Sequence, residues 1–81
     1  MSDAEHESIE RARILVRKLA RLLTLKGLPH ADATVALAYA LHDSASDLTG
    51  NPFAGIEWMR DAADVMERKL MEESGGKQTA H

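Results

Sequence analysis

The sequence predicts an all-α protein: a small antiparallel three-helix bundle, complete on its own or completed by dimerisation. Hydrophobic residues make up 44% of the 81 residues and aromatic residues only 4%, and the many Ala, Leu, Glu, Arg and Met residues favour helix over strand. Apolar residues recur at helical spacing, and no useful run alternates apolar and polar residues. Glycine and proline interrupt the pattern at residues 27–29 and 50–52. These two breaks divide the chain into three helices, and such short connections make consecutive helices antiparallel neighbours.

The first helix is expected over residues 3–26. Ser2 and Glu5 have the spacing of a capping box, in which each side chain binds the backbone N–H of the other residue. At the far end, Gly27 can adopt the left-handed conformation that ends many helices, and Pro29 cannot continue the helix.

The second helix is expected over residues 30–48 and the third over residues 52–73. Gly50 ends the second helix shortly before a proline. Asn51 is a favourable N-cap for the third helix, and Pro52 is well suited to its first position because the missing N–H has no partner there.

A single domain is expected over residues 1–73. At this length a chain buries only about 60% of the surface that it exposes when unfolded, so the core is small. Small domains without disulfides or metals often gain stability by oligomerisation. Residues 74–81, "SGGKQTAH", contain no large apolar side chain, and we expect them to form a flexible C-terminal tail.

Positive charge is concentrated in the first helix. Residues 11–26 carry six Lys and Arg residues and no acid, although the whole chain has a formal net charge of −3. At 100° per residue most apolar residues of this helix gather on one side as the expected core, and the cations lie opposite. The basic side carries Arg11, Arg13, Arg17, Lys18 and Arg21. Ile14 and Leu25 also lie there, beside Arg17, Lys18 and Arg21. They are either exposed residues without a special role or a partner-binding surface.

The second helix is apolar on two sides. One side packs in the predicted bundle, and the other carries Val35, Tyr39 and His42. This second side is either core within the chain or an interface, and the sequence leaves both readings open. We therefore expect Val35, Tyr39 and His42 as the first candidates for partner contact, followed by Ile14 and Leu25 of the first helix with the three cations beside them.

These patterns favour a non-enzymatic protein that acts through protein–protein contacts, as an accessory or regulatory factor and as a homodimer. In one alternative the basic back of the first helix binds nucleic acid. The acidic balance of the chain argues against it, as does a second helix without Arg, Lys, Asn or Gln to read bases. In the other alternative, His42 and Tyr39 form the proton-transfer pair of a small helical enzyme, but no sequence feature indicates a pocket.

Several kinds of site are not expected from the sequence. The chain has no cysteine, which excludes disulfides and thiolate metal sites. His6 and Glu10 share a helix face, but zinc needs at least three protein ligands, so we expect no metal and no cofactor. The apolar runs are far shorter than the ~20 residues that span a bilayer, and the polar start does not resemble a signal peptide. We expect a cytoplasmic protein without membrane contact.

Overall fold

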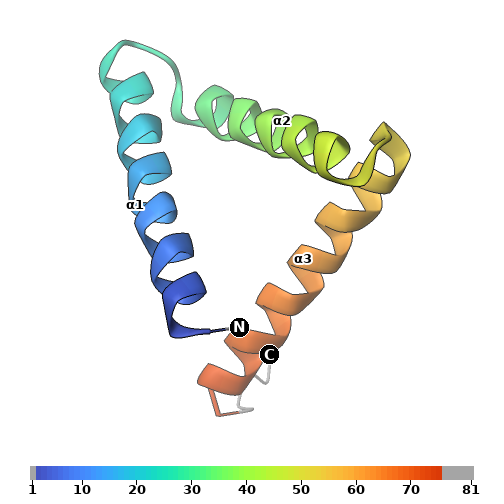
Figure 1. Cartoon of the computed structure of the whole chain (residues 1–81). Helices are drawn as coiled ribbons and strands as arrows, with labels where there is room; N and C mark the ends of the chain where they lie inside the picture. The colour runs from blue at the N-terminus through green and yellow to red at the C-terminus, as the bar shows by residue number, and fades with distance from the viewer. Residues whose placement is uncertain (1, 76–81) are drawn as a thin grey trace. The chain divides into compact units, whose positions relative to one another are not determined.

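The fold is all-α in the computed structural model, which describes residues 2–75 (Figure 1). Its three helices are α1 (Asp3–Leu25), α2 (His30–Thr49) and α3 (Pro52–Glu73). No strand occurs within residues 2–75. The predicted all-α, three-helix fold class is confirmed, and each helix starts at the residue expected from the sequence. Of the predicted tail, residues 74–81, only residues 74 and 75 belong to the described part of the chain.

The chain forms two compact units, Met1–Ala38 and Tyr39–His81. The first contains α1 and the start of α2, and the second contains the rest of α2 and α3. The single domain expected over residues 1–73 stays a prediction.

The start of α1 is closed by the predicted capping box. The backbone N–H of Glu5 donates to Ser2 Oγ at 3.2 Å, and the backbone N–H of Ser2 donates to Glu5 Oε1 at 2.9 Å. The bond from the Ser2 backbone, and after it the bond from the Ser2 hydroxyl, lower the pKa of the Glu5 carboxyl below its ordinary value. The acid of the capping box is thereby kept charged at the positive end of the helix dipole.

The end of α1 is a Schellman turn built on Gly27. This residue has a φ of 103°, in the left-handed region that glycine adopts without steric cost, and its N–H donates to the carbonyl of Thr24 at 3.0 Å. The N–H of Leu28 donates to the carbonyl of Leu23 at 3.1 Å. The two bonds satisfy carbonyls at the end of the helix and turn the chain toward α2.

The second unit is held together where α2 passes close to α3. Gly55 is buried, and a Cβ placed on it would lie 2.6 Å from Ser46 Oγ and 3.0 Å from Ser46 N. Only glycine fits such an approach between two helix backbones. At the start of α3, Asn51 Oδ1 accepts a hydrogen bond of 2.8 Å from the N–H of Ala54, as expected of an N-cap.

Within the first unit, the apolar face of α1 is not buried. Within residues 2–75 the buried residues are the small Ala33, Ala45 and Gly55, and α1 contributes none. The first unit offers α1 only the start of α2, which is rich in alanine. Five large side chains of this face therefore stay exposed: Ile9, Leu15, Val16, Leu19 and Leu22. We refer to these five residues as the apolar face of α1.

Candidate protein-interaction surfaces

The basic side of α1 is hollowed. One hollow of about 370 Å³ is lined by Arg17, Ala20, Arg21, Thr24, Leu25 and His30. A second hollow of about 200 Å³ is lined by Ile14, Arg17, Lys18 and Arg21. Arg17 and Arg21 line both, so the two hollows adjoin. We refer to Ile14, Arg17, Lys18, Arg21 and Leu25 as the basic surface of α1.

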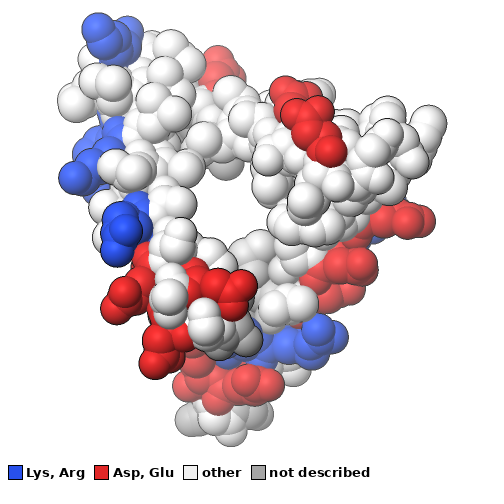
Figure 2. All heavy atoms as spheres, viewed as in Figure 1, with Lys and Arg blue, Asp and Glu red and all other residues white. Residues whose placement is uncertain are grey.

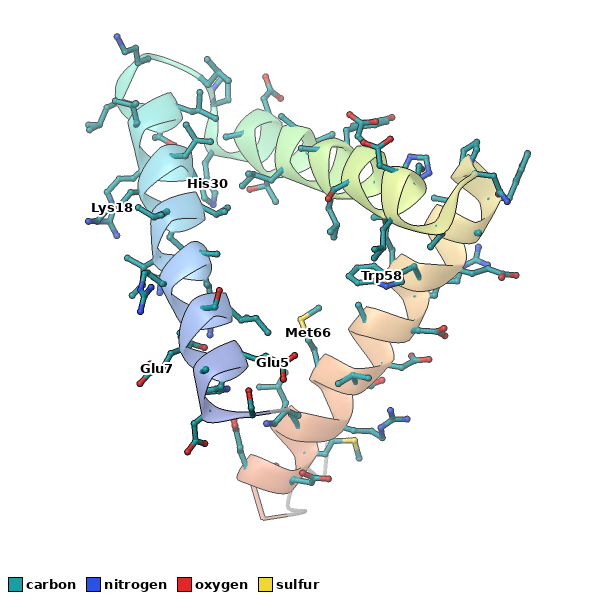
Figure 3. The ribbon with its side chains drawn as sticks, in the orientation of Figure 1. Glu5, Glu7, Lys18, His30, Trp58 and Met66 are labelled. Carbon is teal, nitrogen blue, oxygen red and sulfur yellow. The ribbon has the colours of Figure 1, made fainter. Side chains whose placement is uncertain are left out.

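The basic surface consists of the five residues that the sequence places together on α1. Ile14 is 52% exposed and Leu25 is 79% exposed, so both apolar members are open to a partner. Lys18 points away from the helix (Figure 3). The role of these residues in binding a partner stays a prediction.

Hydrogen-bond donors dominate the polar lining of the larger hollow. The guanidinium groups of Arg17 and Arg21 carry five N–H donors each and no acceptor. The Thr24 hydroxyl donates to the carbonyl of Ala20 at 3.2 Å, so its hydrogen is used within the helix. Leu25 and Ala20 form the apolar part of the lining of this hollow. This lining matches a carboxylate that lies next to an apolar side chain.

The cations of the basic surface have no ion-pair partner within residues 2–75. Figure 2 shows Lys and Arg along the C-terminal part of α1 and acidic side chains near its start. The ion pair found in the described part of the chain joins Arg13 Nη1 to Glu10 Oε2 at 3.6 Å. Both residues are exposed and lie one helical turn apart on α1. Arg17, Lys18 and Arg21 therefore keep their charges available to another molecule.

His30 is a member of the larger hollow that the sequence pattern does not indicate. It is the first residue of α2, and Figure 3 shows it at the end of α2 that follows the turn. The Schellman turn at Gly27 returns the chain toward α1 and so brings this residue beside Arg21 and Leu25 in the lining. The signal in the sequence is the glycine that ends the helix, not the histidine itself.

The three candidates on α2 have different surroundings. Val35 is exposed in the first unit; in the second unit Tyr39 is 68% exposed and His42 is half-buried. His42 Nε2 lies 2.9 Å from the carbonyl oxygen of Pro52. Because a carbonyl can only accept, Nε2 carries the proton and donates it. His42 thus links α2 to the start of α3, and Val35 and Tyr39 are the exposed candidates.

Residues 2–75 contain no cluster of three or more His, Cys, Asp or Glu side chains that could hold a metal ion. Over the same residues, no helix is both long enough and apolar enough to cross a membrane. No protein-family model, curated protein or solved structure significantly matches the chain.

Proposed function

We propose that the protein acts through protein–protein contacts, without catalysis of its own, as an accessory or regulatory factor that forms a homodimer. The observation that carries the proposal is the exposure of large apolar side chains on α1. None of the 23 residues of α1 is buried, and Leu15 is 61% exposed. Contiguous exposed apolar patches are typical of interaction sites.

The energy available from the apolar face supports self-association. Full burial of a Val, Leu, Ile or similar side chain contributes about 1.5–3 kcal/mol. The side chains of the apolar face are already about half covered, so covering the rest contributes about 1 kcal/mol each, on the order of 10 kcal/mol for two copies. The loss of translational and rotational freedom costs about 4–15 kcal/mol. The free energy gained by burial and the cost of the lost freedom are comparable, so the apolar face alone supports a reversible dimer. Further contacts decide the affinity of that dimer.

The contact of His42 supports a role in packing. Its side chain links α2 to the carbonyl of Pro52 at the start of α3. The cytoplasm is the proposed location, and the charged residues, 28% of the chain and present on all three helices, fit an aqueous compartment.

Light scattering after size exclusion, at two protein concentrations, tests the proposal. The wild-type chain is expected to approach twice 8.9 kDa, and Leu15→Lys/Leu22→Lys is expected to remain at 8.9 kDa. The control Asp43→Lys/Asp47→Lys adds two lysines at exposed positions of α2 and should keep the wild-type mass. A wild-type monomer at both concentrations, or an undiminished mass of the α1 variant, contradicts the proposal. Circular dichroism checks that each variant stays helical.

Tyr39→Glu separates the two candidate surfaces in the same assay. A mass that remains that of the dimer excludes the second side of α2 from the interface, because Tyr39 is exposed on that side. A lower mass extends the interface to the second side of α2.

A further inference from the structure

The basic surface and the apolar face lie on opposite sides of α1. At about 100° per residue, Leu15 and Leu19 lie roughly half a turn of the helix away from Arg17 and Arg21. Figure 2 shows Lys and Arg side chains along α1. A second copy that covers the apolar face, as in the proposed homodimer, therefore leaves the basic surface open to a different molecule.

Charged and apolar side chains are ordered along the basic surface. Four of its members share one side of the helix at intervals of three, four and four residues: Ile14, Arg17, Arg21 and Leu25. Both apolar members are exposed, and both arginines line the two adjoining hollows. The surface therefore presents two guanidinium groups between two exposed apolar side chains.

The chemistry of this surface favours carboxylates over the phosphates of a nucleic acid. Binding to nucleic acid depends on the neutralisation of many phosphates along the backbone, whereas the basic surface has three cations, Arg17, Lys18 and Arg21. Burial of Ile14 and Leu25 is favourable against apolar side chains, which a phosphate backbone does not offer. Arginine binds carboxylates through two parallel hydrogen bonds. An acidic protein with apolar side chains therefore complements the surface better than a nucleic acid does.

The basic surface is open and elongated, which suits a protein segment better than a small molecule. All five of its members are exposed, whereas small-molecule sites bury most of the surface of their ligand. Leu25 lies eleven positions beyond Ile14, which corresponds to about 16 Å along the helix axis. On a second helix, carboxylates four residues apart are separated by about 6 Å along the axis, the same spacing as Arg17 and Arg21. A helix that lies against α1 thus meets both guanidinium groups at once.

We infer that the basic surface of α1 binds an acidic amphipathic helix of another protein. In this complex two carboxylates of the partner, four residues apart, pair with Arg17 and Arg21, and apolar side chains of the partner cover Ile14 and Leu25. One of these apolar side chains enters the larger hollow, of about 370 Å³, beside Leu25. The ion pairs orient the partner, and the apolar contacts supply affinity. The inference rests on the proposed action through protein–protein contacts, but it does not use the homodimer.

Titration of a labelled synthetic peptide, followed by fluorescence anisotropy, tests this inference. The peptide is a helix of about 20 residues in which Leu, Glu, Glu and Leu occur in this order at intervals of four, with Ala and Gln elsewhere. Saturable binding to the wild-type chain is expected. A matched peptide with Gln in place of both Glu residues is expected to bind at least about tenfold more weakly, because it loses both ion pairs. No saturable binding of the glutamate peptide, or equal affinity of the two peptides, overturns the inference.

Substitutions in the chain locate the binding site. Arg17→Gln/Arg21→Gln is expected to weaken binding of the glutamate peptide at least about tenfold. The control Arg11→Gln/Arg13→Gln removes the same charge from α1 outside both hollows, and it is expected to change the affinity less than about threefold. Leu25→Ala is expected to weaken binding about fivefold through the lost apolar contact. Equal losses in the two arginine variants indicate a general attraction between charges and overturn the inference. Circular dichroism checks that each variant stays helical.

Two further measurements identify other occupants of the surface. A labelled DNA duplex that binds the wild-type chain more tightly than the peptide, and loses this affinity in Arg17→Gln/Arg21→Gln, assigns the surface to nucleic acid and overturns the inference. Light scattering of the wild-type chain saturated with peptide is expected to show the dimer with bound peptide. Dissociation into monomers shows that a second copy occupies the basic surface, and it also overturns the inference. A wild-type chain that is monomeric without peptide, yet binds the glutamate peptide through Arg17 and Arg21, contradicts the homodimer and supports this inference, so the two failures are distinguishable.

Discussion

Substitution of Gly55 by alanine tests the contact between α2 and α3. The added Cβ would lie 2.6 Å from Ser46 Oγ, 3.0 Å from Ser46 N and 3.1 Å from Ser46 Cα. A hydroxyl can rotate, but the two backbone atoms move only if the helices separate by a few tenths of an ångström. Such overpacking costs about 1–3 kcal/mol, and replacing glycine in a helix returns about 1 kcal/mol. Because two of the three close atoms belong to the backbone, we expect an overpacking cost in the upper part of this range, about 2–3 kcal/mol, and therefore a net loss of about 1–2 kcal/mol. Each kcal/mol lowers the Tm by roughly 4–8 °C in a domain of this size.

Thermal unfolding followed by circular dichroism at one fixed protein concentration measures this loss. Ala63→Gly, at an exposed position of the same helix, provides the intrinsic difference between alanine and glycine. Ser46→Ala should change the free energy of unfolding little, because the buried Ser46 Oγ has no hydrogen-bond partner within residues 2–75. Ser46→Ala/Gly55→Ala should still be destabilised through the backbone contacts. A Gly55→Ala chain as stable as the wild type would refute the close approach.

Two further predictions concern helix starts. Ser2→Ala should raise the pKa of Glu5 toward its ordinary value, measured by NMR titration of the carboxyl, whereas the control Ser8→Ala should not move it. Because the pKa of Glu5 is lowered in the folded chain, its stabilising contribution is present above the ordinary pKa and is lost as the pH falls through the lowered one. Asn51→Ala should cost about 1 kcal/mol of stability in chemical denaturation, because the N–H of Ala54 loses its acceptor, and Asn51→Gly only a few tenths; equal losses would contradict the capping role.

The sequence is informative about helix ends because they depend on local chemistry. The capping box at Ser2, the left-handed glycine at Gly27 and the N-cap at Asn51 each involve atoms only a few residues apart. Their geometry follows from the residue types and their spacing, without reference to the rest of the fold. This explains why the helix boundaries agree so closely with expectation.

The sequence is less informative about what covers a face. Periodicity shows that Leu15, Leu19 and Leu22 share a side of α1, but it contains no information on which surface lies against them. The contact of His42 with the carbonyl of Pro52 likewise depends on how α2 approaches α3, which is set by Gly55. Such features depend on how one helix packs against another, and the spacing of residues along a helix does not determine this packing.

The basic surface of α1 could be predicted because all five of its members lie on one helix. A regular helix places residues four apart beside each other, so the grouping of Arg17, Arg21 and Leu25 follows from geometry alone. His30 reaches the same hollow through a turn, and it carries no sequence signal of its own.

The central claim is that a second copy covers the apolar face of α1, and intermolecular NMR contacts test it most directly. One copy with ¹³C-labelled methyl groups is mixed with an unlabelled copy, and only contacts between labelled and unlabelled protons are recorded. We predict intermolecular contacts to the methyl groups of Leu15, Leu19 and Leu22, which are exposed within one chain. The absence of intermolecular contacts to these methyl groups, at a protein concentration where light scattering shows the dimer, would contradict it.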